Sequence, residues 1–181
     1  MTGFTFPEGG HLRFAETGDV DALVQLVEST YRGDSSRKGW TTEADFLDGQ
    51  RTDAQEIREL LANEKSRVIV HVENGVLLGC CNVENEGEGV AYFGMFSVRS
   101  DLQGKGVGRT ILTEAERFAK EAWAARVMRM TVIDIREELI AFYERRGYQR
   151  TGKHKPFPYG NPRFGVPKRG DLRFEILEKP L

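Results

Sequence analysis

The sequence has no run of about 18 or more apolar residues, so no segment of it is expected to cross a membrane. The N-terminal stretch MTGFTFPEGG lacks the basic and apolar parts of a signal peptide. With neither signal present, we expect a cytoplasmic protein.

Cysteine is also scarce, because Cys80 and Cys81 are the only two in the chain. They are adjacent in an apolar segment, where a strand would direct them to opposite faces and would strain a disulfide between them. Adjacent cysteines also lack the spacing of a zinc or thiol-exchange motif. We expect two reduced thiols in or near the core.

Several motifs of known catalytic sites are missing. No HExxH or paired-cysteine pattern occurs, and His11, His71 and His154 are isolated in the sequence, so no metal site is expected. No GxSxG nucleophile elbow is present either, since Ser97 lacks the flanking glycines. This absence favours a reaction without a covalent enzyme intermediate.

The composition indicates one compact domain over residues 1–181, with 39% hydrophobic residues and no low-complexity stretch. The net charge of -2 is unevenly distributed: residues 1–100 carry 9 Lys and Arg against 17 Asp and Glu, whereas residues 101–181 carry 17 against 11. The basic half either handles an anion or is an ordinary solvated surface. A pI of about 6.0 argues against general nucleic-acid binding.

Hydrophobic spacing and turn residues predict a mixed α/β sheet with helices on both faces. Asn74-Gly75 is the signal of a tight hairpin, and Gly87 and Gly89 precede the next strand. The expected strands are 11–15, three between 66 and 98, 125–134, 148–153 and 171–179. The expected helices are 17–33, ended by Gly33, a short one capped by Thr42 with Asp45, 53–65 capped by Asp53 with Glu56, 107–122, and 137–147, closed by Gly147.

Three glycines on alternate positions precede the helix at 107–122, in the sequence QGKGVG (103–108). A helix N-terminus presents unpaired N–H groups and the positive end of its dipole, and small residues let a phosphate approach the backbone. The alternative is a turn that merely needs positive φ. Lys105 is followed by Gly106 instead of a hydroxyl residue, so this is not a Walker loop, and the spacing also fails the dinucleotide fingerprint.

These residues resemble the GNAT superfamily of N-acetyltransferases. Gln103, Gly106 and Gly108 match its Q/R-x-x-G-x-G/A signature, and ELIAFYERRGYQRTG (138–152) is similar to its FYE-x-x-GF/Y pattern. The order of elements agrees over nearly the whole chain. The resemblance implies a mostly antiparallel sheet of about seven strands that splays between the fourth and fifth strands to admit acetyl-CoA.

The resemblance also implies roles for particular residues. The stretch 103–108, called the glycine cradle below, would hold the pyrophosphate of acetyl-CoA, and the fourth strand would pair with the pantetheine arm. The residues assigned to cofactor binding are Phe96, Ser97, Val98, Gln103, Gly104, Lys105, Gly106, Val107, Gly108 and Arg109. Backbone N–H groups at Phe96 or Ser97 are candidates to polarise the thioester carbonyl. Tyr143 would be the general acid for the departing thiolate, since a phenol of pKa about 10 is protonated at neutral pH. The alternative is that Tyr143 only packs beside Phe142.

Two positions depart from the family pattern. Arg136 stands where many members have an asparagine that holds the pantetheine end; it is assigned to cofactor binding, with contact to an anionic substrate or a solvated position as alternatives. The fourth strand carries no carboxylate, so the base is Glu84, Glu86 or Asp134 acting through water, or no single residue.

Two loops would flank the acceptor side, at 30–46 and 155–169. Their arginines and aromatics suit a small amine that also bears a carboxylate, although they are equally typical of loop anchors. The substrate candidates are Tyr31, Arg32, Trp40 and Tyr159; the same loops also contain Arg37, Phe157, Arg163 and Phe164. A protein N-terminus or lysine is the rival acceptor.

Two other classes remain. The chain could be a non-catalytic acetyl-CoA sensor that kept the cradle and lost turnover, or a phosphate-binding module unrelated to CoA. No nucleic acid, membrane or metal partner is expected, and a homodimer is one of the open options for assembly.

Overall fold

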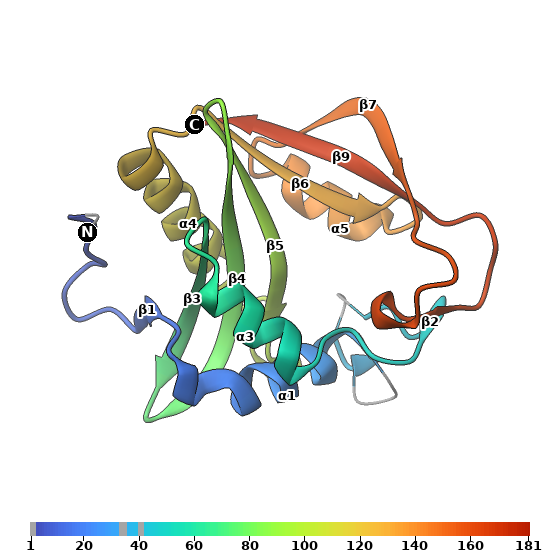
Figure 1. Cartoon of the computed structure of the whole chain (residues 1–181), viewed down its shortest axis with the longest axis horizontal. Helices are drawn as coiled ribbons and strands as arrows, with labels where there is room; N and C mark the ends of the chain where they lie inside the picture. Colours follow the sequence, from blue (N-terminus) through green and yellow to red (C-terminus); the bar gives the residue numbers. More distant parts are fainter. Residues whose placement is uncertain (1–2, 33–35, 40–41) are drawn as a thin grey trace.

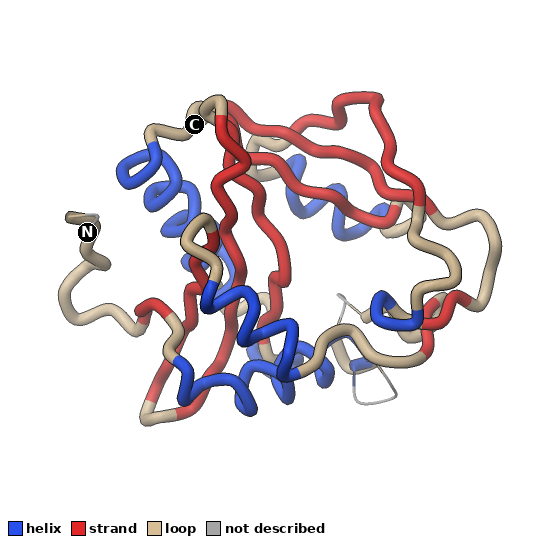
Figure 2. The backbone as a smooth tube through the Cα atoms, viewed as in Figure 1, coloured by secondary structure: helices blue, strands red, loops and turns tan. Residues whose placement is uncertain are grey.

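The computed structural model describes residues 3–32, 36–39 and 42–181. Its seven-stranded sheet has the spatial order β1-β3-β4-β5-β6-β9-β7 (Figures 1 and 2). The strands are β1 (Leu12–Phe14), β3 (Ser66–Glu73), β4 (Val76–Gly87), β5 (Val90–Val98), β6 (Val127–Ile133), β7 (Gln149–Pro156) and β9 (Arg173–Pro180). All neighbouring strands are antiparallel except β5 and β6, so the predicted mixed, mostly antiparallel sheet is confirmed.

Helices cover both faces of the sheet. On one face α1 (Val20–Tyr31) and α3 (Ala54–Ala62) pack against a cluster that contains Val68, Val70 and Cys80. On the other, α4 (Val107–Trp123) and α5 (Glu137–Glu144) share a cluster with Ile69 and Cys81. Both cysteines are free and fully buried. They lie on opposite faces because successive strand residues alternate, as the sequence predicted.

Two residues with positive φ form each of the two hairpin turns. Asn74 and Gly75 both have positive φ, 50° and 77°, which is the conformation that a two-residue type I′ turn requires. Glu88 and Gly89 repeat it between β4 and β5, with φ of 53° and 81°. These turns set the register of the three central antiparallel strands.

The sheet opens between β5 and β6. These parallel strands pair only at Val90–Tyr92 with Val127–Arg129, and Figure 1 shows them separating beyond that point. At Met95 the φ angle is 51° and the register of β5 against β4 shifts, which marks a bulge. In chain order β5 and β6 are the fourth and fifth strands of the main sheet. The predicted splay between these two strands is therefore confirmed.

One predicted helix is wrong. The sequence favoured a short helix capped by Thr42 and Asp45, but residues 44–46 form a turn. Thr42 Oγ1 accepts a hydrogen bond from the N–H of Ala44, so the hydroxyl satisfies a local turn instead of a helix end. The expected cap of α3 is confirmed, because the Asp53 carboxylate accepts from the Glu56 N–H at 2.8 Å. Gly33, expected to end α1, lies outside the described residues; α1 ends at Tyr31.

A second, two-stranded sheet was not predicted. β2 (Leu47–Asp48) pairs with β8 (Val166–Pro167), which follows a short 3-10 helix at Pro162–Phe164. Beneath it, a separate buried cluster joins it to the ends of β6 and β9; its core is Leu47, Ile133, Phe157 and Leu172. The pairing ties together the two loops that the sequence assigned to the acceptor side.

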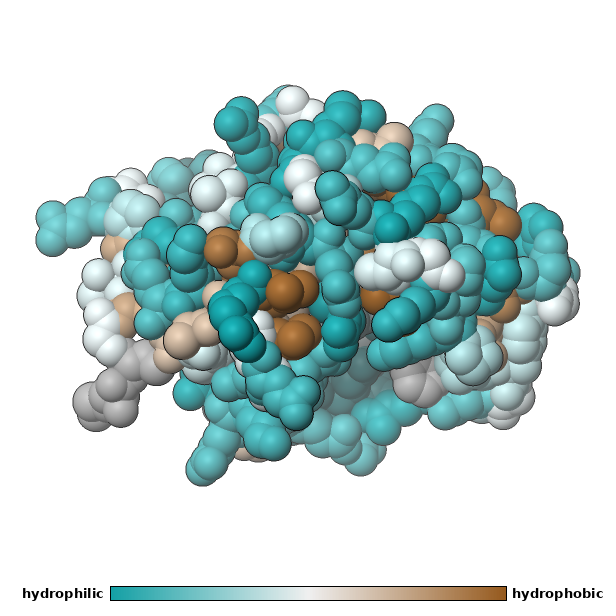
Figure 3. Space-filling model, turned by 90° about the horizontal axis from the view of Figure 1, so that it is seen from above, coloured by the Kyte–Doolittle hydropathy of each residue, from teal (hydrophilic) through white to brown (hydrophobic). Residues whose placement is uncertain are grey.

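None of the helices in the described part of the chain is both long and apolar enough to span a membrane. On the face seen in Figure 3, hydrophobic residues appear in small separate areas among hydrophilic ones. Scattered apolar residues of this kind are normal for a protein surface.

Candidate active site

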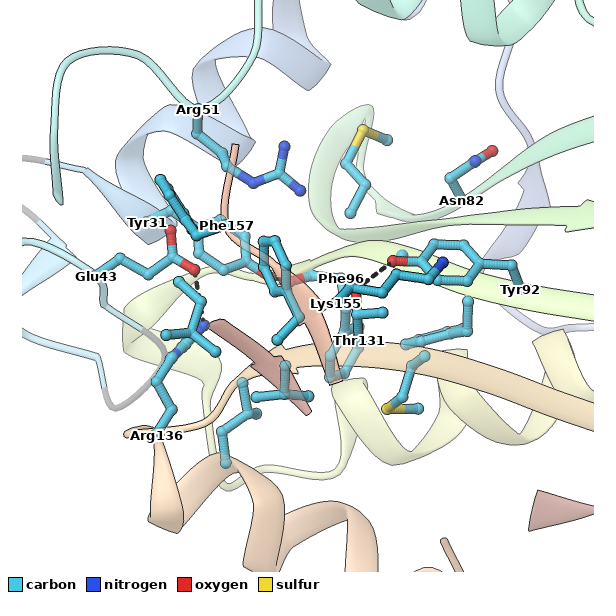
Figure 4. A pocket seen from close by; sticks show the side chains of 18 of the residues that line it. Tyr31, Glu43, Arg51, Asn82, Tyr92, Phe96, Thr131, Arg136, Lys155 and Phe157 are labelled. Atoms are coloured by element: carbon cyan, nitrogen blue, oxygen red, sulfur yellow. Dashed lines mark hydrogen bonds and ion pairs between the residues drawn. The ribbon is translucent and has the colours of Figure 1, made fainter. Parts of the chain in front are cut away.

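A cavity of about 580 Å³ lies where β5 and β6 separate. Its walls come from helices α1, α3 and α5, from the segments before α3 and after β7, and from residues of strands β4, β5, β6, β7 and β9. In the close view of Figure 4, Tyr31, Glu43, Arg51 and Arg136 gather at one end, whereas Asn82 and Tyr92 lie at the other. The gap between β5 and β6 therefore contains a cavity with an arginine-rich end.

Tyr143 extends from α5 into this cavity. Its side chain is 4% exposed, and its hydroxyl makes no hydrogen bond to any described residue. Burial raises the pKa of Tyr143 well above its usual value, so the phenol stays protonated at neutral pH. The ring also packs against Phe142 at 5.3 Å and Tyr148 at 5.8 Å between centroids. Packing explains the ring, but not a hydroxyl that faces the cavity without a partner.

The bulged end of β5 forms the wall beside Tyr143. The Tyr31 hydroxyl donates to the carbonyl oxygen of Phe96, and burial raises the pKa of Tyr31 to about 12, which keeps it a donor. Gln103 Nε2 donates to the carbonyl oxygen of Val98 at 3.0 Å. A carbonyl oxygen can accept two hydrogen bonds, so Phe96 and Val98 each keep one acceptor site. Pairing of this strand with a pantetheine arm stays a prediction.

The glycine cradle lies at the start of α4. Gly104 and Gly106 have φ of 82° and 90°, so the turn does require positive φ at both. No atom lies within 4 Å of the position that a Cβ would occupy on either glycine, which leaves open space over the backbone. Gly108 differs, because its Cβ would lie 2.9 Å from Cζ of Phe96. The N–H groups of the first helical turn, from Val107 onward, have no partner within the helix.

A second cavity, of about 560 Å³, lies between α4 and the residues that follow α5. Arg109, Arg145 and Arg146 line it. Burial lowers the pKa of Arg146, and the charges of Arg145 and Arg109 lower it further. Arg109 and Arg145 form no ion pair with a described residue. Glu116 and Lys179 also line the cavity and pair with each other at 2.7 Å, so the three guanidiniums supply its excess positive charge, which favours an anionic guest. The sequence analysis assigned Arg109 but missed the other two.

Glu43 holds two arginines at the mouth of the main cavity. Its carboxylate pairs with Arg32 and, at 3.0 Å, with Arg136; the Arg32, Glu43 and Arg136 side chains are 5%, 9% and 7% exposed. Burial alone raises the pKa of Glu43, but Arg136 and Arg32 outweigh it and hold the pKa below its usual 4.5. The alternative of a solvated Arg136 is therefore wrong. Its contact with cofactor or substrate stays a prediction.

We expect Glu43→Gln to lower the free energy of unfolding by about 3 to 5 kcal/mol, because two buried guanidiniums lose their counter-charge. Urea denaturation measures this. Since the pKa of Glu43 is lower in the folded chain, the wild type keeps this stability above about pH 4.5 and loses it as pH falls through the folded pKa. The variant lacks that acid-dependent loss. Asp45→Asn is the control, since the Arg37–Asp45 pair is exposed and should leave the midpoint nearly unchanged.

Arg51 is a cavity residue that the sequence analysis missed. It precedes α3 in a segment without periodicity, so nothing in the sequence set it apart. Its guanidinium points into the cavity in Figure 4, with Cζ 5.5 Å from the centroid of the Tyr31 ring. The Arg51 backbone N–H donates to Glu28 Oε1 at 2.6 Å, but its guanidinium makes no hydrogen bond or ion pair with a described residue, unlike those of Arg32 and Arg136. Burial lowers the pKa of Arg51, but the nearby Glu43 carboxylate and other groups outweigh it and raise the pKa, so the arginine-rich end presents one charged guanidinium without a direct ion pair.

The three candidate bases differ in their surroundings. Glu86 pairs with Arg129 at 2.9 Å, and Asp134 pairs with Arg173 at 2.6 Å and does not line the cavity. Glu84 lines the cavity, and its carboxylate makes no hydrogen bond or ion pair with a described residue. Among the three, Glu84 has the carboxylate most available to accept a proton.

The substrate candidates fall into two groups. Tyr31 and Arg32 line the cavity, as expected. Tyr159 does not: it is 43% exposed, donates to the carbonyl of Arg169 and accepts from the N–H of Leu172, so it anchors its loop. Its assignment to the substrate is not supported by this position. Trp40 lies outside the described residues.

The three histidines are not all isolated in space. His154 pairs with Glu175 at 3.0 Å, and the rings of His11 and His71 stack with centroids 5.4 Å apart. The histidines are far apart in the sequence, but the pairing of β1 with β3 brings His11 and His71 together in space.

Comparison with known proteins places this chain in a family. The model of the acetyltransferase (GNAT) family matches residues 21–148, and the chain belongs to that family. The uncharacterized protein YdhI of Bacillus subtilis is 34% identical over 77 residues, which is 42% of this chain and 46% of that protein. The matched segment thus spans less than half of that relative.

Solved structures agree in fold. The ribosomal-protein-alanine N-acetyltransferase from Brucella melitensis superposes with a TM-score of 0.67 and 18% identity, over 94% of this chain and 99% of that one. A putative phosphinothricin N-acetyltransferase gives 0.68 and 21%, over 94% and 97%. At such identities the likeness shows the shared fold alone. The GNAT resemblance seen in the sequence is confirmed.

Proposed function

We propose that this chain is an acetyl-CoA-dependent N-acetyltransferase that moves an acetyl group to the primary amine of a small molecule by direct attack. We also propose that residues 1–181 form one such domain. The observation that carries the proposal is the Tyr143 hydroxyl, protonated and without a partner, in the chamber where β5 and β6 separate.

The chain fits the phosphates of acetyl-CoA at two places. Open space over Gly104 and Gly106 lets a pyrophosphate reach the first-turn N–H groups of α4. The adjacent trio of Arg109, Arg145 and Arg146 would balance the remaining phosphate charge. The bound thioester supplies an activated acetyl group next to the bulge of β5. Gln103 supports the cradle by fixing the end of that strand through Val98.

Different residues of the main cavity would then carry out the separate proton transfers. Glu84, through water, takes a proton from the ammonium so that the neutral amine attacks the acetyl carbon. A backbone N–H near Phe96 or Ser97 stabilises the negative charge on the carbonyl oxygen. As the carbon–nitrogen bond forms and the carbon–sulfur bond breaks, Tyr143 donates its proton to the sulfur. The tyrosinate regains a proton from the nitrogen through water, and Glu84 releases the proton it took from the ammonium to solvent, so both groups return to their starting states.

The acceptor class follows from the arginine-rich end. Arg32 and Arg136 share Glu43, whereas Arg51 keeps an unpaired guanidinium that faces the cavity. A carboxylate on the acceptor would pair with Arg51 in a site shielded from water, where such a contact is strong. We propose a small amine that bears a carboxylate, such as an amino-acid derivative.

The experiment is an acceptor screen monitored by release of free thiol. We expect carboxylated amines to be used with kcat/KM at least ten-fold higher than the same amines without the carboxylate. Arg51→Gln should remove that preference, because the loss of one buried charge partner costs about 1.5 to 3 kcal/mol. Arg163→Gln is the control, since Arg163 pairs with Glu59 outside the cavity.

Three results would separate the alternatives. If decarboxylated amines react equally well, the acceptor class is wrong and the enzyme class stands. If only peptides are acetylated, the rival acceptor is correct. If acetyl-CoA binds and no amine reacts, the chain is a sensor.

A further inference from the structure

The edge of the sheet far from the cavity brings together three side chains of metal-binding type. His11 lies in the bend just before β1, and His71 and Glu73 lie two residues apart on β3. β1 and β3 are paired, with Leu12 opposite His71, and the His11 carbonyl accepts from the Val72 N–H at 2.8 Å. None of the three lines the main cavity, so this cluster is separate from the proposed active site.

The distances fit coordination of one ion. His71 Nε2 lies 3.0 Å from Glu73 Oε1, and His11 Nε2 lies 3.8 Å from the same oxygen. All three ligand atoms fall within 4.8 Å of one another. Tetrahedral zinc with bonds of 2.0 to 2.2 Å separates its ligand atoms by about 3.4 Å, which lies between the two measured distances. The His11 side chain is 53% exposed, so it is free to make the small adjustment.

A second observation is the incomplete bonding of His71. The residue is 7% exposed, and its Nδ1 is buried without a hydrogen-bond partner. Among the described residues, the ring's one hydrogen-bond partner is Glu73. An imidazole this buried with one unsatisfied nitrogen is poorly explained as a packing residue, because an apolar side chain would fill the space without that cost. The nitrogen that would coordinate is Nε2, which lies 3.0 Å from Glu73 Oε1; the unpartnered Nδ1 shows that packing alone does not account for the ring and is not itself a ligand atom.

We propose that His11, His71 and Glu73 form a binding site for a divalent transition metal, with Zn²⁺ as the expected ion. Two imidazoles and one carboxylate are ligands that Zn²⁺ prefers, and water completes the coordination. The same three groups suit Mg²⁺ poorly, because Mg²⁺ requires oxygen ligands. The ion would fasten the segment before β1 to β3, two strands away from the splay. Its role is to stabilise the N-terminal edge of the sheet, without a part in acetyl transfer.

The test is zinc titration of the tag-free, chelator-treated full chain against a chromogenic chelator, with thermal unfolding in parallel. We expect one Zn²⁺ per chain and, at about 100 times the dissociation constant, a rise in Tm of roughly 5 to 10 °C. Mg²⁺ should give no shift. Cys80 and Cys81 are fully buried and do not compete for the ion. Co²⁺ in place of Zn²⁺ should give the visible absorption bands of a low-symmetry site.

Two variants test whether zinc binds at these three residues. His11→Ala and Glu73→Gln change half-exposed side chains, so both should fold, and each should weaken zinc binding about ten-fold or more. His154→Ala is the matched control, because His154 also pairs with a carboxylate and has no second histidine beside it. It should bind zinc like the wild type. The proposal is overturned if the wild type shows no zinc-dependent shift, or if His11→Ala and Glu73→Gln both bind as tightly as His154→Ala.

Discussion

Replacement of Tyr143 by phenylalanine is expected to lower kcat about 10²- to 10⁴-fold with little change in KM. The substitution removes only the hydroxyl, which has no hydrogen bond to a described residue, and keeps the ring contacts with Phe142 and Tyr148. The fold should therefore be unaffected. What is lost is the proton donor to the leaving sulfur. Steady-state kinetics by thiol release, with Tm as a check on folding, measures the change.

The same cavity offers a matched control. Tyr92 also lines it, but its hydroxyl is already bonded to Thr131 Oγ1 at 2.8 Å. Tyr92→Phe should keep kcat within a few-fold of the wild type. Because burial raises the pKa of Tyr143, wild-type activity should not fall near pH 10 through loss of this proton. A Tyr143→Phe enzyme with full kcat would mean that the residue only packs.

Gly106→Val is the second change with a large expected effect: we expect at least a ten-fold weaker affinity for acetyl-CoA. The side chain would occupy the open space over the backbone, where a phosphate must approach closely. Isothermal titration with acetyl-CoA measures the affinity directly and does not depend on knowing the acceptor.

Backbone strain must be separated from this steric effect. A branched residue at a φ of 90° costs about 1 to 2 kcal/mol of stability on its own. Gly152→Val provides the comparison, since Gly152 has φ of 76°, also has nothing within 4 Å of its Cβ position, and lies on β7. It should lose similar stability and bind acetyl-CoA normally. Equal loss of binding in the two variants would remove the cradle from the proposal.

Local signals predicted the framework well. Asn74-Gly75 fixes a hairpin because both residues tolerate positive φ, and Asp53 caps α3 because its carboxylate reaches the Glu56 N–H. The cradle glycines and Tyr143 were singled out because they lie within contiguous motifs. In each case the determining residues are close together in the sequence, so no knowledge of tertiary contacts was needed.

The residues that were missed owe their roles to contacts across the fold. Glu43 gains its role only where Arg32 and Arg136 meet it, and these come from three separate segments. Arg51 stands out because it lacks such a partner, which only the structure shows. His11 meets His71 through the register of β1 on β3. The Thr42 error has the opposite origin: a local capping pattern was present, but the hydroxyl bonded to a turn.

The small sheet of β2 and β8 bears on how acceptor preference can change during evolution. Leu47 is opposite Pro167 and Asp48 is opposite Val166, so segments far apart in the chain are held in a fixed register beside the cavity. An insertion in one of them would pull the other out of position. Relatives with different acceptors should therefore differ in both segments together. To transfer the acceptor preference of one relative to another, both segments would have to be exchanged at once.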